Sequence, residues 1–562
     1  MGSATTVAEL VQRQWGDHRV GLRYGDLVLS HHQVASGSAA RAALLAELLH
    51  TGPRGAEPHL GVLLDNTPEF PLWIGAAALA GAAVAGINPT RRGAELARDI
   101  LHTECRVLVT ERAHLPLLDG LELPGVRVLV TDTDAYAGLL APYEGAKPGE
   151  STALPGRGAR PGSRLLLYFT SGSTGAPKAA ICTQGRLAAA GASLVAQFGV
   201  RPDDVHYICM PMFHGNAVIA DWAPALAAGA SVALRRRFSA SRFLPDVRAY
   251  GATYFTYVGR AVQYLLATPE RADDREHRLR LGFGTEAGAV DAARFEQRFG
   301  VRLVEGYGSS EGGAAVQRTP GTPSGAIGRA APGDDLAVVD PATGEECETA
   351  RFSDSGRLLN GDRAIGELVN RGRSLFEGYW RNPEAETARV REPGGWYWTG
   401  DLFFRDADGF LYFAGRTDDR LRVDSENLAA AVIENILARW ASAAAVAVYA
   451  VPDPVAGDQV MAAVALRDGA AFDPDAFAIF LAAQKDLGTK MAPRFVRVMA
   501  RLPVTATNKI HRAGLRREGF RHAGEVWWRP AGERAYRRLT EEDEGALLHA
   551  YETHGRADLL DR

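Results

Sequence analysis

The feature that most constrains this chain is the alternation of short apolar segments with helical patterns over its first 165 residues. The apolar segments HLGVLLD (59–65) and RVLVT (106–110) predict buried strands, and residues 93–102 between them have the spacing of an amphipathic helix. Residues 21–29 predict a hairpin. Strands that alternate with helices form a mainly parallel sheet covered by helices. The sequence therefore predicts an α/β fold.

Signals for helix starts and loops divide the chain further. Ser30 and Gln33 form a capping-box pattern that predicts a helix up to His50. A Pro-, Gly- and Ser-rich segment at residues 145–163 predicts a loop or a seam between subdomains. Short strands predominate after residue 325, so this part of the chain is expected to be β-rich.

Beyond residue 416 the pattern changes to that of a small α+β module. Its expected elements are a helix at 429–441, strands at 445–451 and 460–466, a helix at 474–483 that is capped by Asp473, and a strand at 494–499. The polar connector TDDR (417–420) predicts a hinge. We therefore expect an N-terminal domain at residues 1–416 and a mobile C-terminal domain at residues 421–562.

Composition excludes several functional classes. The 562 residues carry a formal net charge of −4, which argues against a nucleic-acid-binding protein, because such proteins usually have a basic excess. Four cysteines without C-x-x-C spacing indicate neither a disulfide framework nor a zinc site, and they fit a reducing cytoplasm. Residues 70–87 are uncharged, but their Ala- and Gly-rich pattern predicts a buried helix, turn and strand, and no transmembrane segment.

Lysine is rare in this chain. Five lysines occur, at positions 147, 178, 485, 490 and 509, and the other 58 of the 63 basic residues are arginine. A lysine that is kept inside a structured motif indicates a site that needs a compact ammonium charge and cannot use a planar guanidinium. Lys178 and Lys509 both lie in such motifs.

The segment YFTSGSTGAPK (168–178) follows the apolar run LLLYF. A loop of Gly, Ser and Thr after a strand offers free backbone N–H groups and hydroxyls, which suit phosphate oxygens. It is not a Walker A loop, because Lys178 lacks the preceding Gly and the following Ser or Thr. A glycine-rich hairpin turn without a ligand is the alternative.

Seven segments in one order along residues 20–515 resemble the motifs of the adenylate-forming superfamily, which includes acyl-CoA synthetases. They are TSGSTGAPK (170–178), MPMFHGNA (210–217), GFGTEA (282–287), EGYGSSEGG (305–313), GELVNRGRSLFEGYWRNPEAET (366–387), WYWTGDLFFRDADGFLYFAGRTDDR (396–420) and LPVTATNKIHR (502–512). The segments TYFTYVGRAVQYLL (253–266), AVYAVPDPVAGDQVMAAV (447–464) and DLGTKMAPRFVRV (486–498) look most like the branch of fatty-acid transport proteins, very-long-chain acyl-CoA synthetases and actinobacterial acyl-CoA ligases.

The resemblance implies a role for residues at each motif. The β- and γ-phosphates of ATP would lie against Thr170, Ser171, Gly172, Ser173, Thr174 and Gly175, with Lys178 beside them. Glu311 would bind Mg²⁺, because a carboxylate is a hard oxygen ligand. The rest of the nucleotide would contact Gly284, Thr285, Glu286, Gly306, Tyr307, Gly308 and Ser310, with Asp401 at the ribose and Arg416 at the ribose or the phosphate side. In the GYW segment, packing is expected and no chemistry.

The implied reaction is that of an ATP-dependent acyl-CoA ligase. A carboxylic acid displaces pyrophosphate from ATP to give acyl-AMP, and coenzyme A then takes the acyl group. Lys509 would stabilise charge in the first half-reaction. Asp418 would be the pivot of a rotation that removes Lys509 and brings Ser425, Glu426 and Asn427 to the coenzyme A channel.

The acid substrate is expected to be hydrophobic, from a medium- or long-chain fatty acid to a bulky ring system. His214, which would also be catalytic, is expected beside the acyl group together with Asn216, Tyr257 and Val258. The sequence departs from the family pattern at Ser425 and Asn508, where Gly is usual. A side chain at Ser425 puts the rate of the thiol step in question. The sequence does not fix the oligomeric state, and a homodimer is one of the states that it allows.

Three alternatives compete with this hypothesis. An amino-acid adenylation domain fits less well, because such domains hold the α-ammonium with an Asp near the histidine motif, and only Asp221 occurs there, well past His214. A second is a ligase specialised for thioesterification of a preformed acyl-adenylate in secondary metabolism. The third is a fatty-acid-binding or uptake protein with vestigial catalysis, against which the intact Lys509, Glu311 and Asp401 argue.

Overall fold

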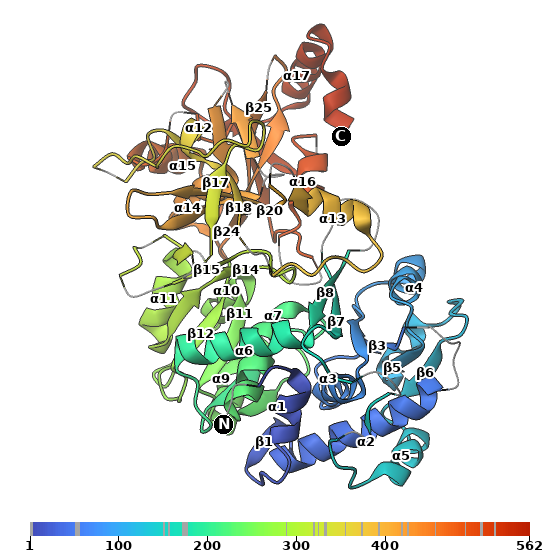
Figure 1. Ribbon diagram of the computed structural model, residues 1–562. Coiled ribbons are helices and arrows are strands. Elements are labelled where there is room, and N and C mark those ends of the chain that lie inside the picture. Colours follow the sequence, from blue (N-terminus) through green and yellow to red (C-terminus); the bar gives the residue numbers. More distant parts are fainter. Residues whose placement is uncertain are drawn as a thin grey trace. The chain divides into compact units, whose positions relative to one another are not determined.

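The computed structural model of the chain falls into two compact units, which are described one at a time (Figure 1). It describes residues 4–561 apart from 51–56, 150–151, 155–157, 171–177, 288, 319–320, 324, 331–333, 355, 373–374, 392–393, 417–419, 424–425, 456, 489, 506–509 and 522–523. The first unit contains residues 1–286, 294–313 and 375–388, and the second contains residues 287–293, 314–374 and 389–562.

The first unit contains two β-sheets. In the six-stranded sheet the order is β6 (Arg127–Val130), β5 (Val107–Thr110), β3 (His59–Leu63), β4 (Ala83–Gly86), β7 (Arg164–Phe169) and β8 (Ala179–Thr183). In the seven-stranded sheet it is β13 (Arg302–Glu305), β12 (Leu281–Thr285), β11 (Tyr254–Val258), β9 (Val205–Ile208), β10 (Ser231–Leu234), β1 (Val20–Tyr24) and β2 (Leu27–Ser30). Only the β7–β8 and β1–β2 pairs of these two sheets are antiparallel. The predicted α/β class with mainly parallel sheets is confirmed.

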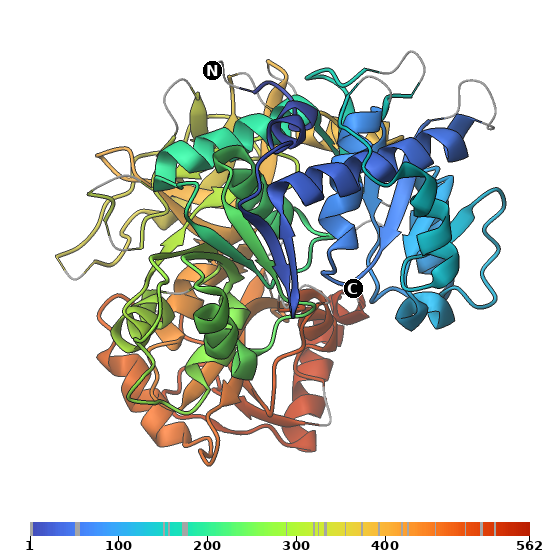
Figure 2. The same cartoon turned by 90° about the horizontal axis from the view of Figure 1, so that it is seen from below.

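Helices follow most strands of these sheets. They are α1 (Val7–Arg13), α2 (His31–His50), α3 (Glu69–Ala80), α4 (Gly93–His102), α5 (Asp134–Leu140), α6 (Gln184–Phe198), α7 (Gly215–Ala217), the π-helical turn η4 (Val218–Trp222), α8 (Ala223–Ala228), α9 (Ala240–Tyr250), α10 (Gly259–Leu266) and α11 (Ala289–Phe299). The hairpin of β1 and β2 leads into α2, which packs along α3 (Figure 2). Ser30 and Gln33 exchange the two capping-box hydrogen bonds, as predicted.

The uncharged stretch at residues 70–87 is a buried helix, turn and strand. It consists of most of α3, a left-handed Gly81 with φ of 73°, and β4. Among the described residues, no helix is long and apolar enough to cross a membrane.

The second unit is rich in strands. One sheet contains β17 (Leu336–Val339), β18 (Gly366–Asn370), β20 (Trp396–Arg405), β19 (Val390–Arg391) and β21 (Leu411–Arg416), and short elements β15 (Ala315–Gln317), β16 (Arg329–Ala330) and α12 (Gly361–Ala364) accompany it. Elsewhere in the chain lie β14 (Tyr307–Gly308) and α13 (Pro383–Arg389). The pair β22 (Arg420–Val423) and β23 (Glu426–Ala429) precedes the last sheet.

The last sheet has the order β24 (Ala443–Pro452), β25 (Asp458–Leu466), β26 (Phe495–Met499), β27 (Glu525–Trp528) and β28 (Arg537–Arg538). Helices α14 (Ala430–Leu437) and α15 (Pro474–Ala483) pack on one face, and α16 (Arg512–Glu518) and α17 (Glu541–Thr553) pack on the other (Figure 1). Asp473 caps α15 by accepting hydrogen bonds from the amides of Asp475 and Ala476, as predicted.

Candidate active site

The predicted phosphate loop connects the antiparallel strands β7 and β8. Phe169 pairs with Ala179, and the Thr170 amide donates a hydrogen bond to the Lys178 carbonyl at 3.0 Å. Residues 171–177, which include Ser171, Gly172, Ser173, Thr174 and Gly175, lie outside the described residues. The two ends of the loop are thus held together at the carboxyl end of β7.

The GYW segment lies along the outer edge of β8. The Ile181 amide donates to the Gly378 carbonyl at 3.1 Å, and the Trp380 amide donates to the Ala179 carbonyl at 2.8 Å. Between these contacts, the Tyr379 hydroxyl donates to Oε1 of Glu311 at 3.0 Å. Both side chains are buried, with exposed fractions of 2% for Tyr379 and 6% for Glu311. The segment expected to serve packing alone therefore fixes one oxygen of the proposed metal ligand.

Arg186, in the first turn of α6, ties three segments together. One guanidinium nitrogen donates to the Ile181 carbonyl at 2.8 Å, and the other donates to the Ser310 carbonyl. The same guanidinium lies 3.8 Å from the Glu377 carboxylate, which also accepts a hydrogen bond from the Thr183 hydroxyl at 2.6 Å. The hairpin, the segment at 305–313 and the segment before Tyr379 are therefore held by one partly buried polar network.

Two glycines allow the backbone of the histidine motif to pack closely against its neighbours. A Cβ atom on Gly86, at the end of β4, would lie 2.8 Å from the Phe213 carbonyl oxygen. A Cβ atom on Gly215 would lie 2.7 Å from the Ser310 hydroxyl. His214 is half-buried at the start of α7, with its ring centre 4.4 Å from that of Phe213. The absence of two side chains thus allows the backbone around His214 to approach β4 and Ser310.

The remaining predicted acyl residues lie on or near neighbouring elements of the first unit. Asn216 is half-buried, and its Oδ1 atom is buried without a hydrogen bond from any described residue. Tyr257 and Val258 end strand β11 and are buried. The Tyr257 hydroxyl donates to the Val304 carbonyl at 3.2 Å, so this group stabilises the sheet.

The predicted adenine residues end strands β12 and β13. A Cβ atom on Gly284 would lie 2.2 Å from the Tyr257 carbonyl oxygen, and one on Gly306 would lie 2.6 Å from the Phe283 ring. Thr285 is half-buried, and Glu286 has a φ of 68°, a left-handed conformation that is rare for a residue other than Gly, Asn or Asp. The carboxyl ends of parallel strands are where α/β sheets bind ligands. Tyr307 is half-buried and Gly308 is exposed.

In the second unit, Asp401 and Arg416 face each other across β20 and β21. They are paired residues of the antiparallel ladder, and Nε of Arg416 lies 3.3 Å from Oδ1 of Asp401. The preceding Gly400 has a φ of 73°, and its amide donates to Oε1 of Glu367 at 2.6 Å. Burial raises the pKa of Glu367. Asp401, expected at the ribose, and Arg416, expected at the ribose or the phosphate side, are therefore adjacent.

Several predicted residues lie wholly or partly outside the described residues. Asp418, Ser425 and Lys509 lie outside the described residues, as does most of the predicted hinge. Glu426 and Asn427 contribute backbone to β23. Their roles remain predictions.

The buried Asp221 is already engaged by other side chains. Oδ1 lies 2.9 Å from Nδ1 of His206, and Oδ2 accepts hydrogen bonds from the Thr256 amide at 3.2 Å and hydroxyl at 2.9 Å. Asp221 lies in the π-helical turn η4, and its side chain and that of His206 have no exposed surface.

A charge cluster with buried carboxylates and exposed arginines joins the two sheets of the first unit. Asp65 and Glu111 each lie within 3.0 Å of Arg236, Asp65 also lies 3.0 Å from Arg237, and His114 lies 3.2 Å from Glu111. The two carboxylates raise the pKa of His114 to about 9. Asp65, Glu111 and His114 are close enough to bind a metal ion, but the guanidinium groups already neutralise the carboxylates, so the cluster is an ion-pair network.

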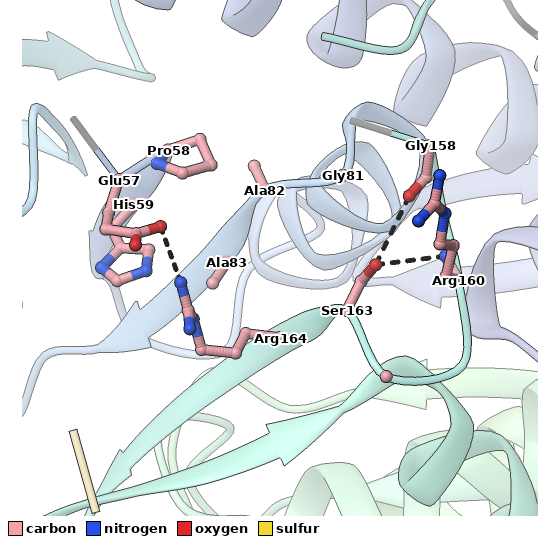
Figure 3. Close-up of a pocket in the computed structure, with 11 residues that line it drawn as sticks. Glu57, Pro58, His59, Gly81, Ala82, Ala83, Gly158, Arg160, Ser163 and Arg164 are labelled. Carbon is pink, nitrogen blue, oxygen red and sulfur yellow. Dashed lines mark hydrogen bonds and ion pairs between the residues drawn. The ribbon is translucent and has the colours of Figure 1, made fainter. Parts of the chain in front are cut away.

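A cavity of about 260 Å³ lies at the amino ends of strands β3, β4 and β7 (Figure 3). Its wall includes His59, Ala83 and Arg164, which begin strands β3, β4 and β7, whereas the loop follows the last residue of β7. An ion pair of 2.7 Å joins Arg164 to Glu57 in its wall (Figure 3). This cavity is therefore not the predicted nucleotide site.

Two comparisons of sequence place the motifs in one family. The family model described as AMP-binding enzyme matches residues 12–380, and the model described as AMP-binding enzyme C-terminal domain matches residues 432–509. Steroid-22-oyl-CoA synthetase of Rhodococcus jostii (strain RHA1) is 49% identical over 99% of this chain and 99% of its own length. The medium/long-chain-fatty-acid–CoA ligase FadD17 of Mycobacterium marinum (strain ATCC BAA-535 / M) is 45% identical over 88% of this chain and 92% of its own length.

A solved structure has the same fold. The anthranilate CoA ligase AuaEII in complex with anthranoyl-AMP gives a TM-score of 0.78 at 22% sequence identity, covering 92% of this chain and 97% of that chain. This likeness supports the fold of the chain described above.

Proposed function

Because the chain belongs to the AMP-binding enzyme family and is an AMP-forming acyl-CoA ligase, we propose that its substrate is a steroid acid whose carboxyl carbon is C22. The observation that carries this proposal is the 49% identity to a steroid-22-oyl-CoA synthetase over 99% of both chains. A medium- or long-chain fatty acid is the second candidate, favoured by the 45% identity to FadD17.

In the first half-reaction a carboxylate oxygen of the acid attacks the α-phosphorus of ATP, and pyrophosphate leaves. This displacement needs alignment and positive charge around the phosphates more than it needs acid–base chemistry. Residues 170–175 and Lys178 surround the β- and γ-phosphates in our proposal. Its support is the joined pair of loop ends at the carboxyl end of β7.

Glu311 is the proposed ligand of Mg²⁺, which would neutralise phosphate charge when bound. The carboxylate suits this role because it is buried, the Tyr379 hydroxyl engages Oε1, and Oε2 accepts no hydrogen bond from any described residue. Mg²⁺ requires hard oxygen ligands of this kind. Arg186 holds the backbone of the adjacent Ser310, so the segment carrying Glu311 is braced against the hairpin.

The nucleoside is bound at two groups of residues in our proposal. Adenine lies against the backbone at Gly284, Thr285 and Glu286 and the ring of Tyr307, with Gly306 and Gly308 leaving room beside it. The ribose hydroxyls donate to Asp401, since the two oxygens of a carboxylate match a vicinal diol. Arg416, which already lies beside Asp401, contacts the ribose or the α-phosphate.

The C-terminal part of the chain turns between the half-reactions in our proposal. Lys509 bridges the acid and the α-phosphate in the first half-reaction, and a rotation at residues 417–420, with Asp418 as pivot, withdraws it. The same rotation brings residues 425–427 to the channel for coenzyme A. Its thiolate then attacks the acyl carbon, and AMP leaves. The domain boundary at these residues is part of the proposal.

The acid panel that tests this proposal contains a pregnane-20-carboxylic acid, dodecanoate and hexadecanoate. Adenylation is followed by pyrophosphate release with ATP and Mg²⁺, and the adenylate is trapped with hydroxylamine with and without coenzyme A. We expect the steroid acid to have the highest kcat/KM. A higher value for either fatty acid would reject the steroid proposal in favour of the second candidate.

The same assay separates the remaining alternatives. No trapped adenylate from any acid, together with thioester formation from synthetic acyl-AMP, would identify an enzyme specialised for the second half-reaction. Loss of both reactions with tight binding of the acid would identify a binding protein. We also propose that the enzyme is cytoplasmic, since all four cysteines are free. Measurement of the molar mass in solution by light scattering tests whether the enzyme is a homodimer.

A further inference from the structure

Glu311 lies in a turn and not in a regular element. Residues 309–312 follow the short strand β14, and the backbone hydrogen bond that closes the turn runs from the Gly312 amide to the Ser309 carbonyl at 3.0 Å. Gly312 has a φ of 70°, a left-handed conformation that suits glycine. The position of this carboxylate therefore depends on the side chains of other segments that contact the turn.

Arg186 contacts the backbone on both sides of Glu311. One nitrogen of its guanidinium donates to the Ser310 carbonyl, and a Cβ atom on Gly312 would lie 2.5 Å from the same nitrogen. The guanidinium thus occupies the space that a side chain at position 312 would need. Since the Tyr379 hydroxyl donates to Oε1, Glu311 is fixed both at its backbone and at its carboxylate.

The same guanidinium is bound to the hairpin of β7 and β8, which carries the predicted phosphate loop. Its second nitrogen donates to the Ile181 carbonyl at 2.8 Å. Ile181 pairs with Leu167 of β7, which pairs in turn with Ala85 of β4, so this carbonyl belongs to the six-stranded sheet. Arg186 therefore ties the turn of Glu311 to a fixed strand beside the phosphate loop.

Glu377 holds Arg186 in this position. Its carboxylate lies 3.8 Å from the guanidinium and accepts hydrogen bonds from the Thr183 amide at 2.7 Å and the Thr183 hydroxyl at 2.6 Å. The Arg186 side chain is 8% exposed, and a guanidinium so deeply buried needs a counter-charge. Glu377 lies two positions before Tyr379, so one short segment supports both anchors of Glu311.

We propose that Arg186 and Glu377 are positioning residues for the metal ligand Glu311. The inference rests on the proposed role of Glu311 in binding Mg²⁺. A ligand that is already held in place binds its ion more tightly, because its side chain and turn lose no further freedom on binding. Pyrophosphate leaves before coenzyme A attacks, so a loosened Glu311 should weaken binding of ATP with Mg²⁺ and adenylation, and spare thioester formation.

Two buried arginines of the first unit provide a matched pair of variants. Arg186→Gln removes the contacts described above. Arg298→Gln is the control, because the Arg298 side chain is 7% exposed, pairs with Asp274 at 2.7 Å and donates to main-chain carbonyls, among them that of Leu266 at 3.2 Å. These partners lie at the end of α10 and beyond it, whereas the candidate site lies at the carboxyl ends of the strands, where α10 begins.

Binding is measured by isothermal titration calorimetry with α,β-methylene-ATP, in which a carbon bridge replaces the oxygen that leaves with pyrophosphate. At a Mg²⁺ concentration that saturates the wild type, we expect Arg186→Gln to raise the Kd by about 10-fold, and in EDTA by less than about 2-fold. Thioester formation from synthetic acyl-AMP should also change by less than about 2-fold. Arg298→Gln should leave both Kd values within about 2-fold of the wild type.

An equal rise in the Kd of Arg186→Gln with and without Mg²⁺, or a rise as large in Arg298→Gln, would overturn the inference, because either result indicates a general loss of structure. If Arg186→Gln does not fold, Glu377→Gln replaces it; this variant keeps an oxygen for Thr183, removes the counter-charge of Arg186 and should raise the same Kd selectively.

Glu311→Gln serves as the reference. If it leaves the Kd at saturating Mg²⁺ unchanged, the proposed role of Glu311 fails, and the inference fails with it. If Glu311→Gln weakens binding with Mg²⁺ and Arg186→Gln does not, the inference about Arg186 and Glu377 alone fails.

Discussion

Removal of the Tyr379 hydroxyl tests whether the proposed metal ligand depends on its buried neighbour. The hydroxyl donates to Oε1 of Glu311 at 3.0 Å, and both side chains are almost completely buried. Tyr379→Phe keeps the ring and its packing against Phe376, whose centre lies 5.2 Å away. The variant therefore removes the hydrogen bond to Glu311 and keeps the aromatic ring.

The expected magnitude follows from what the hydrogen bond does to the carboxylate. Without it, Glu311 gains rotational freedom in the free enzyme and must lose that freedom when Mg²⁺ and ATP bind. Fixing one flexible side chain costs about 0.5–1.5 kcal/mol on binding. This corresponds to roughly a 2- to 12-fold rise in the Mg²⁺ and ATP concentrations needed for half-maximal adenylation. At saturation kcat should fall less than these concentrations rise.

The assay is pyrophosphate release at a series of Mg²⁺ concentrations. Tyr207→Phe is the matched control, because the Tyr207 hydroxyl donates to a buried carboxylate, that of Asp246, at the same distance of 3.0 Å. The control should leave the Mg²⁺ dependence unchanged. An unchanged or tighter Mg²⁺ dependence in Tyr379→Phe, with a clear weakening in Glu311→Gln, would refute the positioning argument and keep Glu311 as the ligand.

Three further predictions follow from the described contacts. Folding raises the pKa of His114 from an ordinary value near 6.5 to about 9, so the charged His114 stabilises the fold fully below about pH 6.5. Up to about 3 kcal/mol of the free energy of unfolding is lost as the pH rises to about 9. Urea denaturation at both pH values should show this loss in the wild type and a smaller loss in His114→Gln. Gly284→Ala should lower the melting temperature strongly, because its Cβ would lie 2.2 Å from the Tyr257 carbonyl oxygen and no rotamer relieves a clash with backbone, whereas Gly308→Ala, which meets nothing within 4 Å, should not. Asp401→Asn should raise the KM for ATP by about 10-fold through the loss of one acceptor for the ribose and of the Arg416 pair, and an unchanged KM would exclude Asp401 from the nucleotide site.

Much of the fold could be predicted because the buried apolar residues of helices and strands recur at regular intervals in the sequence. Helix α4 has the predicted bounds, and the cap at Asp473 is where its side chain and the following proline indicate. Helix α14 is shorter than predicted and ends at Leu437, because the chain then turns and buries Trp440 in the same apolar cluster. The elements after residue 524 were not predictable, since β27 depends on a partner strand some 30 residues earlier and the first turn of α17 consists of acidic residues.

In the candidate site, residues in local motifs could be predicted, and contacts between distant segments could not. Glu311 and Asp401 could be named from local motifs, because each carries its chemistry in a short segment. The partner of Glu311 could not, since Tyr379 reaches Glu311 across 68 positions, and neither could the contact between Thr183 and Glu377 across 194 positions. The only signal was the GYW sequence, whose aromatic residues predict packing equally well. Arg186 had no signal, because arginine is the ordinary basic residue of this chain.

Asp221 decides between a ligase for a hydrophobic acid and an amino-acid adenylation domain. To bind an α-ammonium, its carboxylate would have to release His206 or Thr256, and either loss would leave a buried donor unsatisfied at a cost of about 1–3 kcal/mol. Burial also raises the pKa of Asp221 against the effect of those hydrogen bonds, which disfavours the charged form that an ammonium needs. Asp221 therefore fixes the turn η4 to strands β9 and β11 through His206 and Thr256. It cannot bind the ammonium group of an amino acid without breaking these hydrogen bonds.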